Sequence, residues 1–300
     1  MATLDTSKII LPNSVTTEVA SKLHDTSVVA ALSPADTLTG FTDDAYNYFT
    51  GGAVAEVVAE GAQKSSHDTA ITPVQGKRFK VQCTTRLSSE LSWADEEDQL
   101  KIIDAIQMDQ AGAIGEALDY VILHAINPAT GTKLTGYTAV SSGANTVNAT
   151  NDALADFDSL IDGAMNADIT GVALSRTWAS TLRKLRTSTG ARQFPEIPAS
   201  FDTGVLEGIP ASTSKTVSAP LAKTDTKVLA FLGDFSTIKW RIARPLEVSV
   251  IPFGDPDGAG DLQRFNQVAY RSEAVFSYAV LDAKRLAVLK SATALSLIHI

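Results

Sequence analysis

One stretch of about 30 residues constrains the fold of this 300-residue chain more than any other. Apolar residues recur there every three to five positions, which places them along one stripe of an α-helix. They are Leu100, Ile103, Ile106, Ala111, Ile114, Leu118, Val121 and Ala125. Ser92 is placed to cap the helix with Asp95 as its box partner, and Asn127-Pro128 ends it. At 1.5 Å per residue the helix is a rod of roughly 45 Å, longer than most helices of globular domains.

Strand patterns precede this helix. Lys77 to Arg86 alternates between apolar and polar side chains, with Phe79 and Val81 on one face. Gly52 to Glu60 is rich in valine and alanine, and the polar link Ala62 to Gly76 separates the two runs. We predict that the runs pair as a long hairpin, although the link is unusually long for a hairpin loop. The apolar face of the second strand then requires cover by an adjacent molecule or, alternatively, by its own domain.

The first fifty residues show no pattern of a compact unit and are expected to form an arm. Lys8 to Pro12 is typical of an extended segment, and a short helix within Val15 to Leu32 is expected to end before Pro34. Beyond the polar connection Ser141 to Asn151 the pattern becomes mixed α/β. The predicted elements there are a helix over 154–164, a strand over 171–174, a helix capped by Ser175 that runs to Arg186, strands over 227–232, 237–243 and 246–251, a long strand over 267–280, and a short closing helix or strand from Asp282.

Composition excludes several classes of protein. The formal net charge is −9, whereas a protein that grips nucleic acid through phosphates needs clustered lysine and arginine. The nearest approach is Arg183, Lys184 and Arg186, whose spacing is typical of a solvated helix face. The apolar runs are too short to span a membrane, the N-terminus lacks a signal peptide, and a single cysteine fits a reducing compartment. We therefore expect a cytosolic protein that contains DNA, if at all, by enclosing it.

The sequence shows no pattern of catalytic or metal-binding chemistry. The four histidines, His24, His67, His124 and His299, are far apart and have no metal-ligand spacing. Cys83 lies on the apolar face of its predicted strand and is expected to be a small buried residue rather than a nucleophile. We predict no catalytic residue, no cofactor-binding residue and no metal ligand.

The best candidate for an ion site is the loop from Asp255 to Asp261. Its three aspartates stand among glycines, and such carboxylates are ligands that calcium prefers. The EF-hand pattern nevertheless fails, because Asn266 stands where the distal glutamate belongs and no flanking helices are predicted. A solvated turn is favoured over a calcium site.

Several runs of the chain, taken in order, are similar to a known family. They are Gly171 to Ser175, Leu182 and Leu185, Gly190, Leu206 to Pro210, Phe231 to Ser236, Asn266 to Glu273, and Ala279 to Ala283. Together with the long helix they resemble the capsid fold of tailed bacteriophages, the Hong Kong ninety-seven type. The resemblance implies an α+β fold. Its expected parts are an N-terminal arm (1–50), an extended E-loop hairpin (51–88), a peripheral domain with a long spine helix (89–148), an axial α/β domain (149–243), return strands of the peripheral domain (244–294) and a non-native tail (295–300).

The resemblance also implies a function. A major capsid protein assembles with copies of itself, in rings of six and five, into an icosahedral shell that encloses double-stranded DNA without reading its sequence. The expected place of the protein is the virion capsid, assembled in the cytoplasm of the host bacterium. Scaffolding, maturation-protease, portal and decoration proteins are the other expected partners. Two alternatives stay open: an encapsulin-like cellular compartment, and an enzyme whose site shows no motif.

Two further expectations concern covalent chemistry and the chain ends. In cross-linking members of the family an E-loop lysine joins an asparagine of a neighbour, and Lys64 or Lys77, Asn266 and Glu273 resemble the residues involved. We expect no cross-link, because the asparagine and glutamate also occur in members that lack one. No scaffolding segment precedes the arm, so scaffold is expected to be separate, absent or already removed. Leu295 to Ile300 matches the translation of a common sequencing-library adapter and is expected to be foreign.

Overall fold

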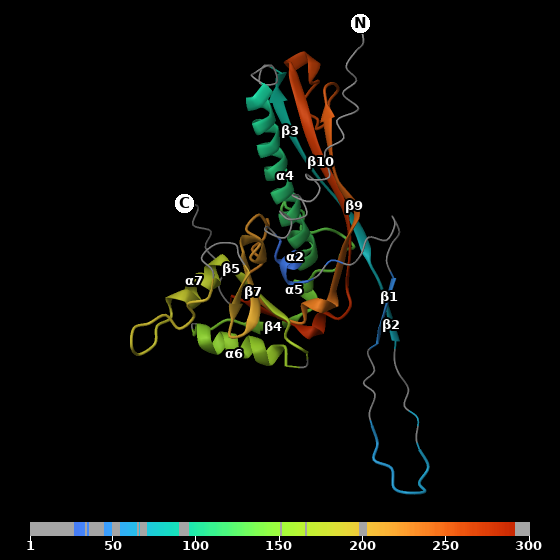
Figure 1. Ribbon diagram of the computed structural model, residues 1–300, viewed down its shortest axis with the longest axis vertical. Coiled ribbons are helices and arrows are strands. Elements are labelled where there is room, and N and C mark those ends of the chain that lie inside the picture. The colour runs from blue at the N-terminus through green and yellow to red at the C-terminus, as the bar shows by residue number, and fades with distance from the viewer. Residues whose placement is uncertain are drawn as a thin grey trace.

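The computed structural model describes residues 27–33, 35, 45–49, 55–64, 66, 71–89, 96–150, 152–165, 167–197 and 203–291, with side chains omitted for 96–105 and 203. These residues form an elongated molecule in three parts (Figure 1). A long three-stranded sheet with one long helix makes the upper part, a six-stranded sheet with two shorter helices makes a lobe beside its lower end, and a two-stranded ribbon projects below. The predicted α+β class is consistent with this arrangement.

The long sheet has the order β3-β10-β9, and all its strands are antiparallel. Its strands are β3 (Lys77–Ser88), β9 (Ile238–Ile251) and β10 (Gln267–Val280). Strands had been predicted over 237–243 and 246–251 as separate elements, and this division is wrong. Pro245 lies instead within a single edge strand, where the pairing register with β10 shifts between Arg244 and Glu247. A proline is tolerated at such a bulge because an edge strand can leave one backbone position unpaired.

The predicted hairpin between 52–60 and 77–86 is also wrong. β3 pairs along its whole length with β10, more than 150 residues later in the chain, and residues 55–60 form no strand. The ribbon is built from other residues, with β1 (Ala45–Phe49) antiparallel to β2 (Ile71–Gln75). Phe79 explains the difference: it lies opposite Phe276 of β10, with ring centroids 5.6 Å apart, and is 7% exposed. Its own chain therefore covers the apolar face of β3.

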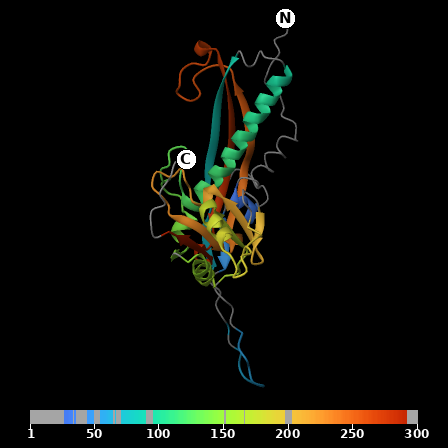
Figure 2. The same ribbon diagram turned by 90° about the vertical axis from the view of Figure 1, so that its left-hand side faces the viewer.

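The long helix is α4 (Glu96–His124), whose 29 residues correspond to a rod of roughly 43 Å. It packs along the long sheet against β3 and β10 (Figure 2). Buried Gln110 fastens it there, because its Nε2 donates to Thr85 Oγ1 at 2.9 Å and to the Tyr270 carbonyl at 3.1 Å. The helix ends as predicted just before Asn127-Pro128, with Ala125 in the left-handed region at φ 52°. The predicted cap Ser92 lies outside the described residues.

The lobe is a six-stranded mixed sheet in the order β4-β11-β8-β5-β7-β6. Its strands are β4 (Asn145–Asn148), β5 (Gly171–Ser175), β6 (Thr203–Leu206), β7 (Ile209–Ser214), β8 (Val228–Gly233) and β11 (Leu286–Lys290). Helices α6 (Ala153–Gly163) and α7 (Arg176–Lys184) pack on it. The predicted cap is confirmed, since Ser175 Oγ accepts from the Trp178 N–H. The closing element is both of the predicted alternatives: a 3₁₀ turn, η5 (Ala283–Arg285), leads into strand β11.

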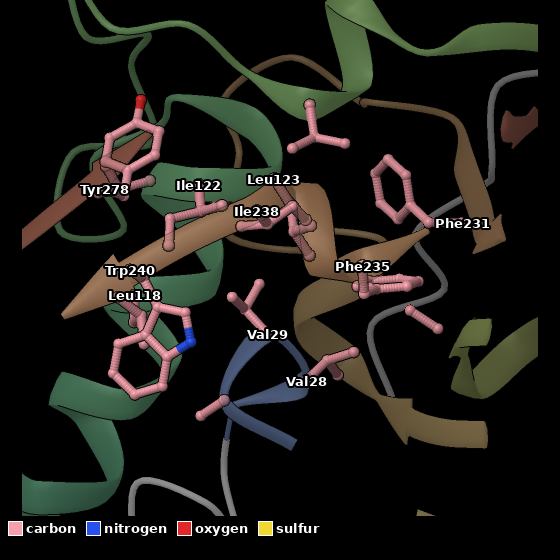
Figure 3. Close-up of a cluster of buried hydrophobic side chains, with 14 of the residues drawn as sticks. Val28, Val29, Leu118, Ile122, Leu123, Phe231, Phe235, Ile238, Trp240 and Tyr278 are labelled. Atoms are coloured by element: carbon pink, nitrogen blue, oxygen red, sulfur yellow. The ribbon is translucent and has the colours of Figure 1, made fainter. Parts of the chain in front are cut away.

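A shared core joins α4, the long sheet and the lobe (Figure 3). The short helix α2 (Val28–Leu32) also contributes side chains to this core. The remaining short elements are α5 (Val140–Gly143), η2 (Lys215–Val217), η3 (Phe235–Thr237) and η4 (Gln263–Phe265). Val28 and Val29 are fully buried among Leu118, Ile122 and Phe235. The helix ends before Pro34, as predicted. This part of the expected arm is thus an integral piece of the core.

Candidate functional site

The β1–β2 ribbon carries an exposed apolar pair on a projecting element. Phe49 and Ile71 are direct cross-strand partners, with exposed fractions of 64% and 52%. Val57, in the segment beyond the strands, is fully exposed. An isolated two-stranded ribbon is marginally stable in water. Exposed apolar pairs on such an element are typical of a surface that another molecule covers.

The ribbon is fastened to the lobe through Arg285. Its Nη1 donates to the Tyr48 hydroxyl of β1 at 3.4 Å. Its Nε lies 3.0 Å from Oδ2 of Asp234, which is largely buried. Only Gly76 separates β2 from β3, so the ribbon continues the line of the long sheet (Figure 1). The direction in which the ribbon points is therefore set by the contact of Tyr48 with Arg285 and by the one-residue link from β2 to β3.

The loop between β9 and β10, the candidate calcium site, binds a guanidinium instead. Arg86 Nε donates to Asp257 Oδ2 at 2.8 Å, and its Nη2 lies 3.1 Å from Asp255 Oδ1 and donates to the Gly260 carbonyl at 3.0 Å. The hydrogen bond from Arg86 is the main reason that the pKa of Asp257 falls to about 2. Asp261 faces elsewhere and accepts from the Arg264 N–H. The favoured prediction of a turn agrees with this geometry.

Phe253 and Phe265 make the same loop an exposed apolar surface. Their exposed fractions are 64% and 56%, and Val250 at the end of β9 is 49% exposed. The loop lies at the opposite end of the molecule from residues 55–64 (Figure 1). The elongated molecule thus exposes apolar side chains at both of its ends.

Asp119 is a buried carboxylate that the sequence analysis did not single out. Its Oδ1 accepts from Ser27 Oγ at 2.6 Å and from the Val29 N–H at 3.1 Å, and its Oδ2 accepts from the Val28 N–H at 2.9 Å and from the Thr216 hydroxyl. Burial raises the pKa of Asp119 to about 6, although the four donors lower it. The carboxylate joins α2, α4 and η2. An aspartate in a helix pattern resembles a solvated residue, so no sequence signal distinguished it.

His124 and Cys83 behave as structural residues. His124 is buried beside Phe231, its Nε2 lies 3.0 Å from the Val217 carbonyl, and burial lowers its pKa to about 4. Cys83 is half-buried on β3, and burial followed by the charge of Asp109 raises the pKa of its thiol. His24, His67 and His299 lie outside the described residues. Among the described residues, no three His, Cys, Asp or Glu side chains come together in a way that could hold a metal ion.

The structure does not bring the cross-linking candidates together within one chain. Asn266, at φ 51°, accepts the Ser89 N–H through its carbonyl at 2.8 Å. Glu273 forms an ion pair with Lys80 at 2.7 Å. Lys77 Nζ donates to the Gly136 carbonyl and lies 5.7 Å from the centre of the Tyr137 ring. Lys64 belongs to the segment 55–64, which lies at the opposite end of the molecule from the loop between β9 and β10 (Figure 1). Whether copies cross-link stays a prediction.

A comparison with protein families decides the class of this molecule. The sequence model of the phage capsid family matches residues 8–291, which is nearly the whole chain. This chain belongs to the phage capsid family. A capsid shell protein has its place in the virion capsid. A search of curated proteins finds no match. Within the described residues, no helix is both long and apolar enough to cross a membrane.

Solved structures agree with this assignment. A chain of Mycobacterium phage Ogopogo has a TM-score of 0.77 and 32% sequence identity, with 89% of this chain and 92% of that chain covered. A chain of Gordonia phage Cozz has a TM-score of 0.71 and 26% identity, with 89% and 87% covered. The capsid of an empty GTA particle has the same fold at 14% identity and a TM-score of 0.55, with 89% and 90% covered. The predicted family membership is confirmed.

Proposed function

We propose that this capsid protein is the major shell subunit of a tailed phage and that it assembles with copies of itself into a closed icosahedral shell around double-stranded DNA. Rings of six and five subunits, joined by heterologous contacts, close such a shell. The ribbon with its following segment corresponds to the E-loop, α4 to the spine helix, and the six-stranded lobe to the axial domain. Assembly in the cytoplasm of the host belongs to the same proposal.

One observation carries this proposal: the ribbon exposes Phe49 opposite Ile71 on an element that has no core of its own. Covering one such side chain contributes roughly 1.5–3 kcal/mol. Repetition of a modest contact in every subunit stabilises a closed shell, because each copy both offers a ribbon and covers one. Phe253 and Phe265 at the other end of the molecule supply apolar surface of the kind that a neighbour can cover.

The test is assembly of the purified protein, followed by light scattering and electron microscopy. We expect closed particles from the wild-type chain and, with nucleic acid present, particles that protect double-stranded DNA from nuclease. Phe49→Asp should fold normally, judged by circular dichroism and thermal melting, yet form few or no shells. A compact monomer at every protein concentration would contradict the proposal. Closed particles that package a protein cargo and never DNA would favour an encapsulin-like compartment.

A further inference from the structure

Helix α7 and the loop after it carry an unpaired basic patch. The patch consists of Arg176, Arg183, Lys184, Arg186 and Arg192. Four of its members are exposed, and Arg183 is half-buried. None of them forms an ion pair within the part of the chain that the structure describes. The Nε atom of Arg183 is covered and has no hydrogen-bond partner there.

Local structure explains only part of this patch. Cations in the last turn of a helix interact favourably with its dipole, and Arg186 donates to the carbonyls of Arg183 and Leu185. Arg176, however, is the first residue of α7, where the helix dipole opposes a positive charge. Arg192 lies directly across a β-bridge from Arg186, a juxtaposition of like charges that disfavours the pairing. These two positions need a different explanation.

Helix α6 carries charges of the opposite sign, in an exposed pair of acidic residues. Asp158 and Asp162 are exposed and four positions apart, so two like charges face the same side of the helix. Asp162 lies in the last turn, where the dipole opposes a negative charge. Neither carboxylate has an ion-pair partner in the described chain. Met165, immediately after the helix, adds an apolar side chain that is 69% exposed.

The two helices are neighbours, yet their charges do not meet within one chain. Phe157 of α6 and Trp178 of α7 are in ring contact at 6.3 Å, and both helices lie on the side of the molecule away from the long sheet (Figures 1 and 2). The ring contact that joins the helices is thus apolar, whereas Asp158, Asp162 and Arg176 are exposed. Two unpaired patches of opposite sign on one chain can neutralise each other between copies.

We propose that the basic patch of α7 and its loop contacts the acidic pair Asp158 and Asp162 of α6 in a second copy of the chain. The inference rests on the proposed shell function. It places one of the contacts between subunits of the shell on the lobe. A nucleic acid is the less suitable partner for the basic patch, because the phosphates would also approach the acidic pair on the adjacent helix and a chain of net charge −9. The contact selects the correct neighbour through its charge pattern.

Charge reversal tests the contact. One variant carries Arg176→Glu and Arg192→Glu, a second carries Asp158→Arg and Asp162→Arg, and a third combines all four changes and keeps the wild-type net charge of −9. These side chains are exposed, so circular dichroism and melting temperatures should match the wild-type protein. We expect each double variant to lose at least about tenfold in shell yield at low salt, because like charges then face each other. The combined variant should regain most of that yield.

Mixing the two double variants provides a second readout. The changed patch of the first variant is complementary in charge to the changed α6 of the second, so an equimolar mixture should form more shells than either variant forms by itself. Normal shells from both double variants, or a loss that neither the combination nor the mixture reverses, would overturn the inference. Shells of the arginine variant that form normally but no longer retain DNA would overturn it in favour of a nucleic-acid contact. Failure of the wild-type chain to assemble would instead contradict the proposed function.

Discussion

Asp119 and His124, five residues apart on α4, are both buried and titrate over the same pH range with opposite effects on stability. The pKa of Asp119 is raised from 3.8 to about 6, so the folded chain takes up a proton there before the unfolded chain does. The free energy of unfolding therefore rises by about 3 kcal/mol as pH falls from 6 toward 4. The pKa of His124 is lowered from 6.5 to about 4, so the unfolded chain takes up a proton on this histidine before the folded chain does. The free energy of unfolding therefore falls by a similar amount as pH falls from 6.5 toward 4.

We expect these two contributions to nearly cancel in the wild-type protein and to separate in single variants. Asp119→Asn leaves His124 uncompensated and should lose stability between pH 6.5 and 4. His124→Gln leaves Asp119 uncompensated and should gain stability between pH 6 and 4. Urea unfolding of unassembled protein at pH 7 and 5 measures both, with the wild-type chain as reference. Parallel pH dependence in all three proteins would show that the two groups are not buried as described.

Arg86 holds the loop between β9 and β10 in one conformation. Arg86→Ala removes the donors to Asp255, Asp257 and the Gly260 carbonyl. The pKa of Asp257 should then rise from about 2 toward its ordinary value, which NMR titration of the carboxyl measures. Limited proteolysis should cut between residues 254 and 261 faster than in the wild-type protein. An unchanged titration would mean that Arg86 does not engage this loop in solution.

Phe79 of the long sheet and Phe49 of the ribbon offer a matched pair of apolar positions, one buried and one exposed. Phe79→Asp places a charge among Phe276, Tyr278 and Tyr137 and should cost at least about 3 kcal/mol, with loss of cooperative unfolding. Phe49→Asp alters an exposed side chain and should leave the melting curve unchanged. Calorimetry of the two variants distinguishes them. Equal melting temperatures would contradict the assignment of Phe79 to the core and Phe49 to a contact with another copy.

Local signals in the sequence predicted the elements better than their partners. The predictions that are correct include the cap Ser175 with the helix after it, the strand 171–174 and the strand 267–280. A helix cap or an apolar period depends only on residues that are close together in the sequence. The alternation in 77–86 shows which face of a strand is apolar but not which strand covers it, and β10 lies far along the chain. The break predicted between 243 and 246 is wrong, because a bulge on an edge strand leaves no local mark in the sequence. Asp119 could not be found, since its partners Ser27 and Thr216 are distant in sequence.

Two truncations at the C-terminus should differ in their effect on the fold. β11 lies between β4 and β8, inside the six-stranded sheet. Ending the chain before Leu286 removes this strand and should yield insoluble protein or lose cooperative unfolding. Ending it before Leu295 removes only the residues predicted to be foreign and should leave both melting and assembly unchanged. Loss of assembly in the longer truncation product would show that the last six residues belong to the functional protein.

The central position of β10 in the long sheet has a consequence for synthesis in the cell. About 180 residues separate the end of β3 from the start of β10, so at typical translation rates roughly 10 to 35 s pass before β3 meets its partner. Contacts so distant in sequence are also slow to form once both strands exist. A ribosome-bound chain therefore holds an open edge at β3 until nearly the whole polypeptide has emerged. Under the proposed function only finished subunits can then assemble, and during the interval the exposed apolar face of β3 favours aggregation and binding by chaperones.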